Sequence, residues 1–265
     1  MSIKDEFDLA GRTAVITGGG GGIGRETAIV LAEAGANIVV GDVKDAGLRE
    51  TVGLVEAVGG KALAVLTDVT QKAQVEALVT AARDHFGSVD VMGNVAGIIR
   101  NNLVVDTPEE ELDAVLAVNL KGVYFGCQAA AAVMIQQRRG SIINFASTGM
   151  DSPVPTISCY ALTKAAVAML TRTLATEVGQ YGVRVNAMAP GFTDTPMTQR
   201  WFTNDDGSVD EIKRNDLWSM RGAQAPLNCI GTARDQALGV LYLASDASRF
   251  VTGQVMRING GVSMV

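Results

Sequence analysis

The stretch Thr13-Ala14-Val15-Ile16-Thr17-Gly18-Gly19-Gly20-Gly21-Gly22-Ile23-Gly24 decides the fold. Its first five residues form an apolar, β-branched run of the kind buried in a parallel sheet. The glycines come next, and Arg25 to Gly35 then has helical periodicity with a glycine stop. Strand, loop and helix in this order leave backbone N–H groups open to a pyrophosphate at a positive helix end. We therefore predict a dinucleotide site at Gly18, Gly22, Ile23 and Gly24, the alternative being a flexible loop.

The next strand, Asn37 to Asp42, ends in an acid 24 positions after Gly18. This offset is typical of a carboxylate that accepts hydrogen bonds from the ribose hydroxyls of a dinucleotide. A 2′-phosphate would meet like charge at Asp42, and Val43 offers no cation to offset it. The sequence thus favours NAD as cofactor, with NADP less favoured. The alternative for Asp42 is a cap for the helix that begins near Ala46.

Strands and helices continue to alternate along the chain, with strands at 62–66 and 89–93 and a helix at about 71–85 between them. Repeated units of this kind predict an α/β fold with one doubly wound parallel sheet, Rossmann-like, with helices on both faces. Ligands bind such sheets at the carboxyl ends of the strands. Five residues at those ends are candidates for adenine and ribose contacts: Asp68, Val69, Asn94, Ala96 and Gly97.

Composition restricts the classes of function. The 265 residues carry a net charge of -6 and no Lys/Arg cluster, which argues against nucleic acid as a partner. The N-terminus is polar, and no later apolar run approaches the roughly 20 residues of a membrane span, so we expect a cytoplasmic protein with no membrane partner. Cys127, Cys159 and Cys229 lack metal-ligand spacing, and no metal is expected. His85 is the one histidine and ends a predicted helix, which makes a Ser-His-Asp hydrolase improbable.

A second motif, Ser158-Cys159-Tyr160-Ala161-Leu162-Thr163-Lys164, places a phenol and an ammonium four residues apart on one helix face. A cation close to a phenol favours the phenolate and lowers a tyrosine pKa from about 10 by roughly one to three units. The pair is suited to proton transfer, although the spacing is weak support by itself. Ser147 lies 13 residues before Tyr160, at the end of the strand 141–146, and Asn119 lies in a long helical stretch from about Pro108 to Gln137.

With these residues in view, the chain resembles the short-chain dehydrogenase/reductase family over nearly its whole length. The family's glycine motif and its catalytic set match at Thr17, Gly18, Gly22, Gly24, Ser147, Tyr160 and Lys164. The family's helix asparagine corresponds to Asn119, and its Pro-Gly turn to Pro190-Gly191, followed by Thr195. One departure is visible, because Val95 in Asn94-Val95-Ala96-Gly97 stands where the family usually has a second asparagine. We interpret it as structural variation that leaves Asn94 available for support.

The resemblance implies a mechanism that the residues permit. Tyr160 would be the general acid/base, and Ser147 would hydrogen-bond the substrate oxygen. Lys164 would hold the nicotinamide ribose and lower the Tyr160 pKa, while Asn119 would hold a water that links Lys164 to solvent. Pro190, Gly191 and Thr195 would complete the cofactor site. Cys159 is expected to be a packing residue, since an adjacent helical position points about 100° away.

After a strand at 183–188 the pattern breaks into a longer irregular region at about 192–232, which we expect to be a substrate lid within a single domain, 1–265. It contains Trp201, Phe202, Leu217, Trp218 and Met220. These side chains favour a bulky or cyclic apolar alcohol or ketone, of the alcohol or hydroxysteroid type, and we expect the lid to order when ligands bind. The chain then returns to a helix at 233–244 and a last strand near 254–258.

Three functions stay open. An NAD-dependent oxidoreductase that interconverts a secondary alcohol and a ketone is favoured. A 3-oxoacyl-thioester reductase is an alternative, because Arg200, Lys213, Arg214 and Arg221 keep an anionic substrate in view. The third is a protein of another class that keeps the glycine loop. It would be a dinucleotide-binding regulator, which has no need of the catalytic set, or a dehydratase or epimerase on a related scaffold, whose relatives generally carry a longer C-terminal substrate domain. The resemblance also implies a homotetramer, formed through the helices near 108–137 and 158–181. The identity of the alcohol, the direction of the reaction and its stereochemistry are not readable from the residues.

Overall fold

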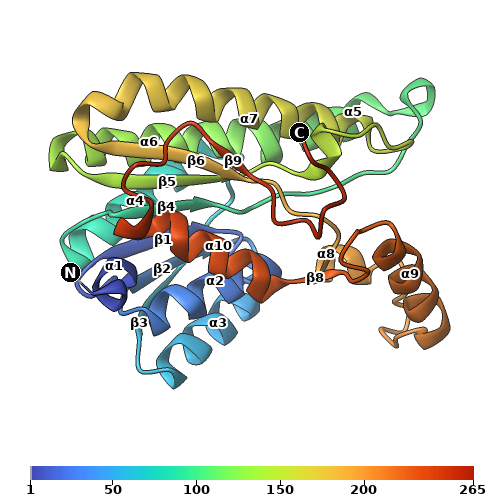
Figure 1. The fold of residues 1–265 in the computed structure, drawn as a ribbon, viewed down its shortest axis with the longest axis horizontal. Helices are drawn as coiled ribbons and strands as arrows, with labels where there is room; N and C mark the ends of the chain where they lie inside the picture. The colour runs from blue at the N-terminus through green and yellow to red at the C-terminus, as the bar shows by residue number, and fades with distance from the viewer. Residues whose placement is uncertain (1) are drawn as a thin grey trace.

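Seven parallel strands form the central sheet of the computed structural model, which describes residues 2–265 (Figure 1). The order across the sheet is β3-β2-β1-β4-β5-β6-β9. The strands are β1 (Thr13–Thr17), β2 (Asn37–Asp42), β3 (Lys61–Leu66), β4 (Val91–Asn94), β5 (Gly140–Phe145), β6 (Val183–Met188) and β9 (Val255–Met256). This order confirms the predicted doubly wound α/β fold in one domain. The order reverses between β1 and β4, so the carboxyl ends of these two strands border the crevice where such folds bind ligands.

Helices cover both faces of the sheet, with α2, α3 and α10 on one and α4, α6 and α7 on the other (Figure 1). Their bounds are α2 (Gly22–Glu33), α3 (Asp45–Ala57), α4 (Lys72–Phe86), α6 (Val123–Gln137), α7 (Ser158–Val178) and α10 (Ala233–Ala244). A short helix, α1 (Ile3–Phe7), precedes the sheet, and α5 (Glu109–Leu116) precedes α6. The predicted elements agree with these bounds to within a few residues, and α2 begins at Gly22 rather than Arg25.

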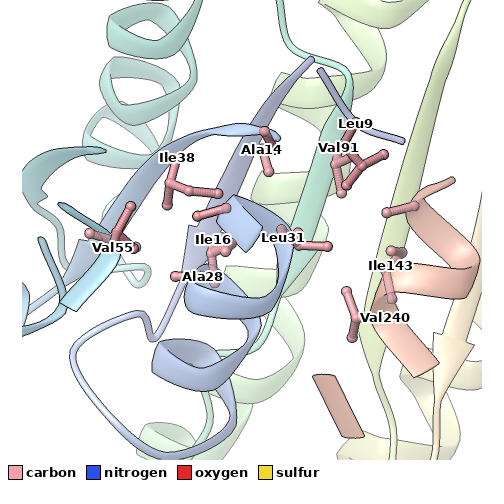
Figure 2. Close-up of a cluster of buried hydrophobic side chains, with 14 of the residues drawn as sticks. Leu9, Ala14, Ile16, Ala28, Leu31, Ile38, Val55, Val91, Ile143 and Val240 are labelled. Atoms are coloured by element: carbon pink, nitrogen blue, oxygen red, sulfur yellow. The ribbon is translucent and has the colours of Figure 1, made fainter. Parts of the chain in front are cut away.

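Alternate residues of each strand fill two hydrophobic cores. Ile16 and Ile38 face one core, where Leu31 and Val240 meet them (Figure 2). The neighbouring strand position, Val15, faces the other core. All five residues of β1 are buried, which explains why its sequence is a continuous apolar run rather than an alternating one. The strand is therefore a fixed base for the glycine loop that follows it.

The helix after the β4 loop is continuous from Glu109 to Gln137 and contains a π-helical turn at Ala117–Gly122. By length and composition this helix qualifies as a membrane-span candidate, which corrects the expectation that no segment approaches that length. In the fold it packs on the sheet, and Cys127 and Met134 are buried in the second core. An inner helix of an α/β sheet is apolar for this reason.

The segment 192–232 is more regular than the sequence suggests. It contains α8 (Pro196–Gln199) and α9 (Glu211–Ala223), and its two ends pair as β7 (Thr193–Asp194) and β8 (Gly231–Thr232). In Figure 1 the two helices extend beyond the end of the main sheet. The prediction of an irregular region was therefore wrong for α8 and α9. Asp210 fixes the start of α9, because its side chain accepts a hydrogen bond from the Lys213 N–H at 3.0 Å.

Candidate active site

The glycine loop after β1 approaches other backbone atoms too closely for any side chain. Gly18 has a φ of +69°, and a Cβ there would lie 2.8 Å from the Ala96 Cα. A Cβ on Gly24 would lie 2.1 Å from the Gly18 carbonyl oxygen. Helix α2 begins at Gly22, its N-cap residue is Gly21, and no side chain caps it. Its first N–H groups are therefore open to an anion, and the loop fits a dinucleotide pyrophosphate, with Ile23 in the first turn.

Asp42 stands at the carboxyl end of β2 and faces the glycine loop. Its Oδ2 accepts a hydrogen bond from the Gly20 N–H at 3.1 Å, and its Oδ1 accepts one from the Lys44 N–H at 3.0 Å. Helix α3 has Lys44 as its N-cap residue with no side-chain cap, so Asp42 is not the helix cap that was the alternative. Each carboxylate oxygen has a second lone pair, which leaves it able to accept from a ribose hydroxyl.

The loops after β3 and β4 hold the next candidates. The Asp68 Oδ1 accepts hydrogen bonds from the N–H and the hydroxyl of Thr70, which closes a turn. Val69 is buried, and it contacts the long helix where a Cβ on Gly122 would lie 2.8 Å from it. Ala96 lies against Gly18, and its N–H donates to the Thr17 hydroxyl at 3.4 Å. These contacts bring the loop after β4 against the glycine loop and the loop after β3 against the long helix.

Asn94 faces away from this crevice. Its side chain is 1% exposed, and its Nδ2 donates to the Asn144 Oδ1 at 2.8 Å, inside the sheet. A direct side-chain contact with a cofactor is therefore not available to Asn94. The network continues from Asn144, whose Nδ2 donates to the Thr171 hydroxyl on α7 at 2.9 Å. This arrangement agrees with the supporting role that the sequence left open for Asn94.

The predicted catalytic set meets where β5 ends and α7 begins. Ser147 and Tyr160 both face Gly149, where a Cβ would lie 3.4 Å from the Ser147 Oγ and 3.8 Å from the Tyr160 ring, and the Ser147 Oγ accepts from the Gly149 N–H at 3.1 Å. Lys164 is buried, its Nζ donates to the Phe145 carbonyl at 2.7 Å, and it lies 5.4 Å from the Tyr160 ring centroid. Three residues from two elements thus share one site, as the spacing predicts.

Burial has opposite effects on the two titrating groups. It raises the pKa of Tyr160, although the hydrogen bond from Ser147 acts in the other direction. It lowers the pKa of Lys164 to about 8. The expectation that Lys164 depresses the Tyr160 pKa is not met in the protein alone, because desolvation outweighs the other influences on the phenol. Both groups are therefore driven towards their neutral forms.

Asn119 lies in the π-helical turn, fully buried. Its Oδ1 accepts from the Ile98 N–H at 2.8 Å, and its Nδ2 donates to the Ile98 carbonyl at 2.8 Å. The amide thereby fixes the loop after β4. Gly97 lies between this amide and the lysine, since a Cβ there would be 3.4 Å from the Asn119 Oδ1 and 3.6 Å from the Lys164 Nζ. A water held at Asn119 stays a prediction.

The remaining cofactor candidates lie across the crevice from the glycine loop. The Pro190 carbonyl accepts hydrogen bonds from the N–H and the hydroxyl of Thr148, next to Ser147. The Gly191 N–H donates to the Ile258 carbonyl at 3.2 Å. Thr195 caps α8, and a Cβ on Gly22 would lie 3.5 Å from its Cβ. The fold thus brings the start of the lid against the first turn of α2.

Sequence reasoning missed an ion pair that supports the serine. Arg257, next to β9, donates its Nε and Nη2 to the two oxygens of Asp151 at 2.8 and 2.9 Å, and the Ser263 hydroxyl adds a contact at 3.3 Å. Asp151 follows the short turn that starts at Ser147. The signal available in the sequence was a lone acid four residues after the serine, which is not specific.

The cysteines Cys127 and Cys159 and the single histidine, His85, lie in packing environments rather than in a site. Burial raises the pKa of the Cys127 thiol to about 12, and Cys159 is partly buried beside Tyr160. His85 contacts Phe86 at the end of α4, and Gly87 ends that helix with a left-handed conformation. Within residues 2–265 no group of three or more His, Cys, Asp or Glu side chains is arranged to hold a metal ion.

Comparison with known proteins defines the class. The family model described as enoyl-(acyl carrier protein) reductase matches residues 18–263. With the sheet order and the site above, the chain belongs to the short-chain dehydrogenase/reductase family, and it is an oxidoreductase that acts on CH–OH groups.

Particular relatives cover nearly the whole chain. One is a 3-oxoacyl-[acyl-carrier-protein] reductase FabG of Thermotoga maritima, 38% identical, with 96% of this chain and 98% of the relative covered. Another is the short chain dehydrogenase/reductase astE of Aspergillus oryzae, 36% identical over 99% of this chain and 98% of the relative.

Solved structures agree in fold. A short-chain type dehydrogenase/reductase from Mycobacterium marinum has a TM-score of 0.90 at 33% identity and full coverage of both chains. Levodione reductase has a TM-score of 0.88 at 35% identity, with 95% and 97% covered. A putative 2-deoxy-D-gluconate 3-dehydrogenase from Agrobacterium tumefaciens, with bound NADP, has a TM-score of 0.85 at 31% identity, with 97% and 98% covered.

Proposed function

We propose that the protein interconverts a secondary alcohol and a ketone, with Ser147, Tyr160 and Lys164 as the catalytic residues. The observation that supports this most directly is the placement of the Ser147 Oγ and the Tyr160 ring around Gly149, 3.4 and 3.8 Å from where its Cβ would be, which brings two hydroxyl-bearing side chains to one point beside the buried Lys164. A carbonyl oxygen at that point would accept hydrogen bonds from both hydroxyls. The same arrangement would hold the hydroxyl of an alcohol.

Side chains of the protein transfer the proton and stabilise the phenolate charge in this proposal. Tyr160 gives a proton to the substrate oxygen during reduction and takes it during oxidation, while Ser147 keeps that oxygen within hydrogen-bond reach. Lys164, 5.4 Å from the phenol ring centroid, favours the phenolate whenever it is protonated. A bound nicotinamide cofactor supplies the hydride donor or acceptor. The roles of Asn119 and Lys164 in relaying the proton to solvent rest on the resemblance.

For the cofactor we infer NAD rather than NADP. Asp42 presents a carboxylate beside the glycine loop, where a ribose would lie, and no described Lys or Arg side chain hydrogen-bonds to it. Val43 is 62% exposed and apolar. Arg25 reaches the neighbouring Gly20 carbonyl, but Glu50 neutralises it through two contacts of 2.7 Å. The NADP in the Agrobacterium tumefaciens structure makes this a point to be measured.

The lid supports an apolar or cyclic body for the substrate. Phe192 and Trp201 stack with ring centroids 5.8 Å apart, and Phe202 meets Trp218 edge to face at 6.1 Å. The stacked Phe192 and Trp201 rings, of which Trp201 is 39% exposed, offer a flat apolar surface one residue beyond Gly191, whereas Phe202 is buried. Levodione reductase, by its name, acts on levodione. The ordering of the lid on ligand binding stays a prediction.

The second candidate is reduction of a 3-oxoacyl thioester. It is favoured by the FabG relatives, whose names specify an acyl-carrier substrate. It requires the same catalytic residues, so the two candidates differ only in what the lid accepts. Comparative kcat/KM on cyclic ketones, steroid ketones, sugars and 3-oxoacyl thioesters separates them. Trp201→Ala and Trp218→Ala should lower kcat/KM for the ring substrates, and an unchanged value would contradict the apolar lid.

The chemistry is tested at Tyr160. Tyr160→Phe keeps the ring and removes the transferable proton, so kcat should fall by about 10² or more while the cofactor still binds. Tyr124→Phe is the matched control, because Tyr124 is 52% exposed and lies outside the site. Rates come from the absorbance of the reduced cofactor and binding from calorimetry. A Tyr160→Phe protein with near-normal kcat would contradict the assignment of Tyr160 as the general acid/base.

A further inference from the structure

Two guanidinium groups from distant parts of the chain converge on one carbonyl oxygen. Arg100, in the loop after β4, donates its Nη1 to the Ile99 carbonyl at 3.2 Å. Arg200, at the end of α8, donates its Nη1 to the same oxygen at 3.0 Å and its Nη2 to the Asn101 Oδ1 at 2.6 Å. Partial burial, and then the charge of Arg100, lower the pKa of Arg200. The lid and the loop are thus joined at a point that holds two like charges.

No carboxylate neutralises this pair within residues 2–265. Neither Arg100 nor Arg200 forms a salt bridge there, and Arg221 on α9 forms none either. The other two basic residues of α9 are paired, Lys213 with Asp210 and Arg214 with Glu211. Like charges in proximity repel unless an anion lies between them. In a chain of net charge -6, such a cluster of unpaired arginines selects for a negative ligand.

Helix α9 adds donors that lack acceptors. The Nε atoms of Arg214 and Arg221 and the Nε1 of Trp218 are buried without a hydrogen-bond partner. Their spacing of four and then three residues puts them on one face of α9. The Arg221 guanidinium lies 5.4 Å from the Phe192 ring centroid, on which Trp201 stacks. Buried donors of this kind are satisfied when an acceptor arrives.

The loop that carries Arg100 contacts the segment that immediately precedes the catalytic helix α7. Asn101 donates its Nδ2 to the Thr156 hydroxyl at 3.2 Å, and Asn102 bridges to Ile157, just before α7. Around Gly149, a Cβ would lie 3.4 Å from Ile157 and 3.8 Å from the Tyr160 ring. Figure 1 shows α8 and α9 beside the end of the sheet where these loops gather. The pair therefore borders the substrate side of the site.

We propose that the substrate carries a carboxylate, or a group of like charge and geometry, which Arg100 and Arg200 bind while its apolar body lies against Phe192 and Trp201. This inference rests on the proposed function and narrows its substrate class to a hydroxy acid or keto acid with an apolar ring or chain. Two guanidinium groups can each offer parallel N–H donors to a carboxylate, which gives both affinity and orientation.

The test uses a matched pair of probes, cyclohexanecarboxylate and cyclohexanecarboxamide, titrated into the protein with saturating NAD. Trp201 and Trp218 are the only tryptophans of the chain and both belong to the lid, so intrinsic fluorescence reports binding there, with calorimetry in parallel. The carboxylate should bind at least about tenfold more tightly than the amide. The double variant Arg100→Gln with Arg200→Gln should bind the carboxylate about ten- to a hundredfold more weakly and bind the amide with unchanged affinity.

Arg49→Gln is the matched control, because Arg49 is 71% exposed on α3 and pairs only with Asp45. A carboxylate that binds no more tightly than the amide, or equally well to the double variant, overturns the inference. The proposed function is examined separately by NADH oxidation with 4-oxocyclohexanecarboxylate and its amide. Absence of turnover with both, while the carboxylate still binds through the arginines, would count against the proposed function and not against this inference.

Discussion

Tyr160 and Lys164 are both held in surroundings that oppose charge, and this sets how the site responds to pH. Burial lowers the Lys164 pKa from 10.5 to about 8, so between these values the unfolded chain binds a proton that the folded chain does not. The free energy of unfolding therefore gains a contribution that rises with pH over this window, on the order of 3 kcal/mol in total.

Lys164→Met should remove that contribution. Urea unfolding at pH 8, 9 and 10 is expected to give a flatter pH dependence for the variant than for the unmodified protein. Cys127, whose pKa is raised, is present in both proteins and so cancels in the difference, and repeating the comparison in a Tyr160→Phe background removes the influence of Lys164 on the neighbouring phenol. Parallel pH curves for the two proteins would show that Lys164 is not desolvated as described.

Asp42 gives a second prediction at this scale. Asp42→Ala removes the carboxylate that would repel a 2′-phosphate, so the kcat/KM ratio of NADP to NAD should rise by about tenfold, and Val43→Arg added to it should raise the ratio further. Leu66→Ala, 63% exposed at the end of β3, serves as the control. An unmodified protein that used NADP more efficiently than NAD would contradict the interpretation of Asp42.

Some residues were predictable and others were not, for physical reasons. Ser147, Tyr160 and Lys164 follow from spacing, because helix periodicity and the end of a strand fix where they lie. The glycines follow from the need for close backbone approach. The direction of the Asn94 side chain did not follow, since a buried polar network depends on partners from two other elements. The raised Tyr160 pKa could not be predicted from the sequence either, because residue spacing does not show how far a side chain is desolvated.

Among the elements, the packing of α6 on β4 offers a sharp test. A Cβ on Gly126 would lie 1.9 Å from the Asn94 Oδ1, and the Asn94 side chain is held in place because its Nδ2 donates to the Asn144 Oδ1. Gly126→Ala should therefore lower the free energy of unfolding by about 1–3 kcal/mol, through overpacking and a disturbed polar network. Gly53→Ala in α3 has open space and should stabilise by roughly 0.5–1 kcal/mol.

Denaturant unfolding of both variants makes this comparison, since each adds one methyl group to a helix. If Gly126→Ala were as stable as Gly53→Ala, α6 would have to lie further from β4 than the structure has it. The lid elements could not be predicted in the same way. Helix α9 is mostly charged and polar, so the signals that could have indicated it were its amphipathic periodicity and its Asp210 cap.

At the scale of the whole molecule, the doubly wound parallel sheet followed from the alternation of apolar strands and amphipathic helices, and the glycine loop lies where the strand order reverses. The alternation did not predict the structure of the segment outside it, from β7 to β8, which we propose carries the substrate specificity. The oligomeric state could not be predicted from the alternation either, because an exposed apolar side chain does not identify its partner.

We predict a homotetramer. Tyr124 on α6 and Leu162 and Met169 on α7 are apolar and more than half exposed, and Phe250 is fully exposed. Burying such side chains between subunits would remove them from water. Light scattering at micromolar concentration should give about four times 27.7 kDa, and Met169→Glu should lower that mass. A monomer mass for the unmodified protein would contradict the prediction. A cytoplasmic location likewise stays a prediction.

The ion pair between Asp151 and Arg257 has a consequence for how the protein can be engineered. Because Arg257 and Ser263 both contact the carboxylate that follows the catalytic serine turn, the last residues of the chain are part of the scaffold of the site. Helix α1, by contrast, buries no residue. Affinity tags, fusion partners and surface attachment therefore belong at the amino end, and trimming the carboxyl end would loosen the serine that orients the substrate.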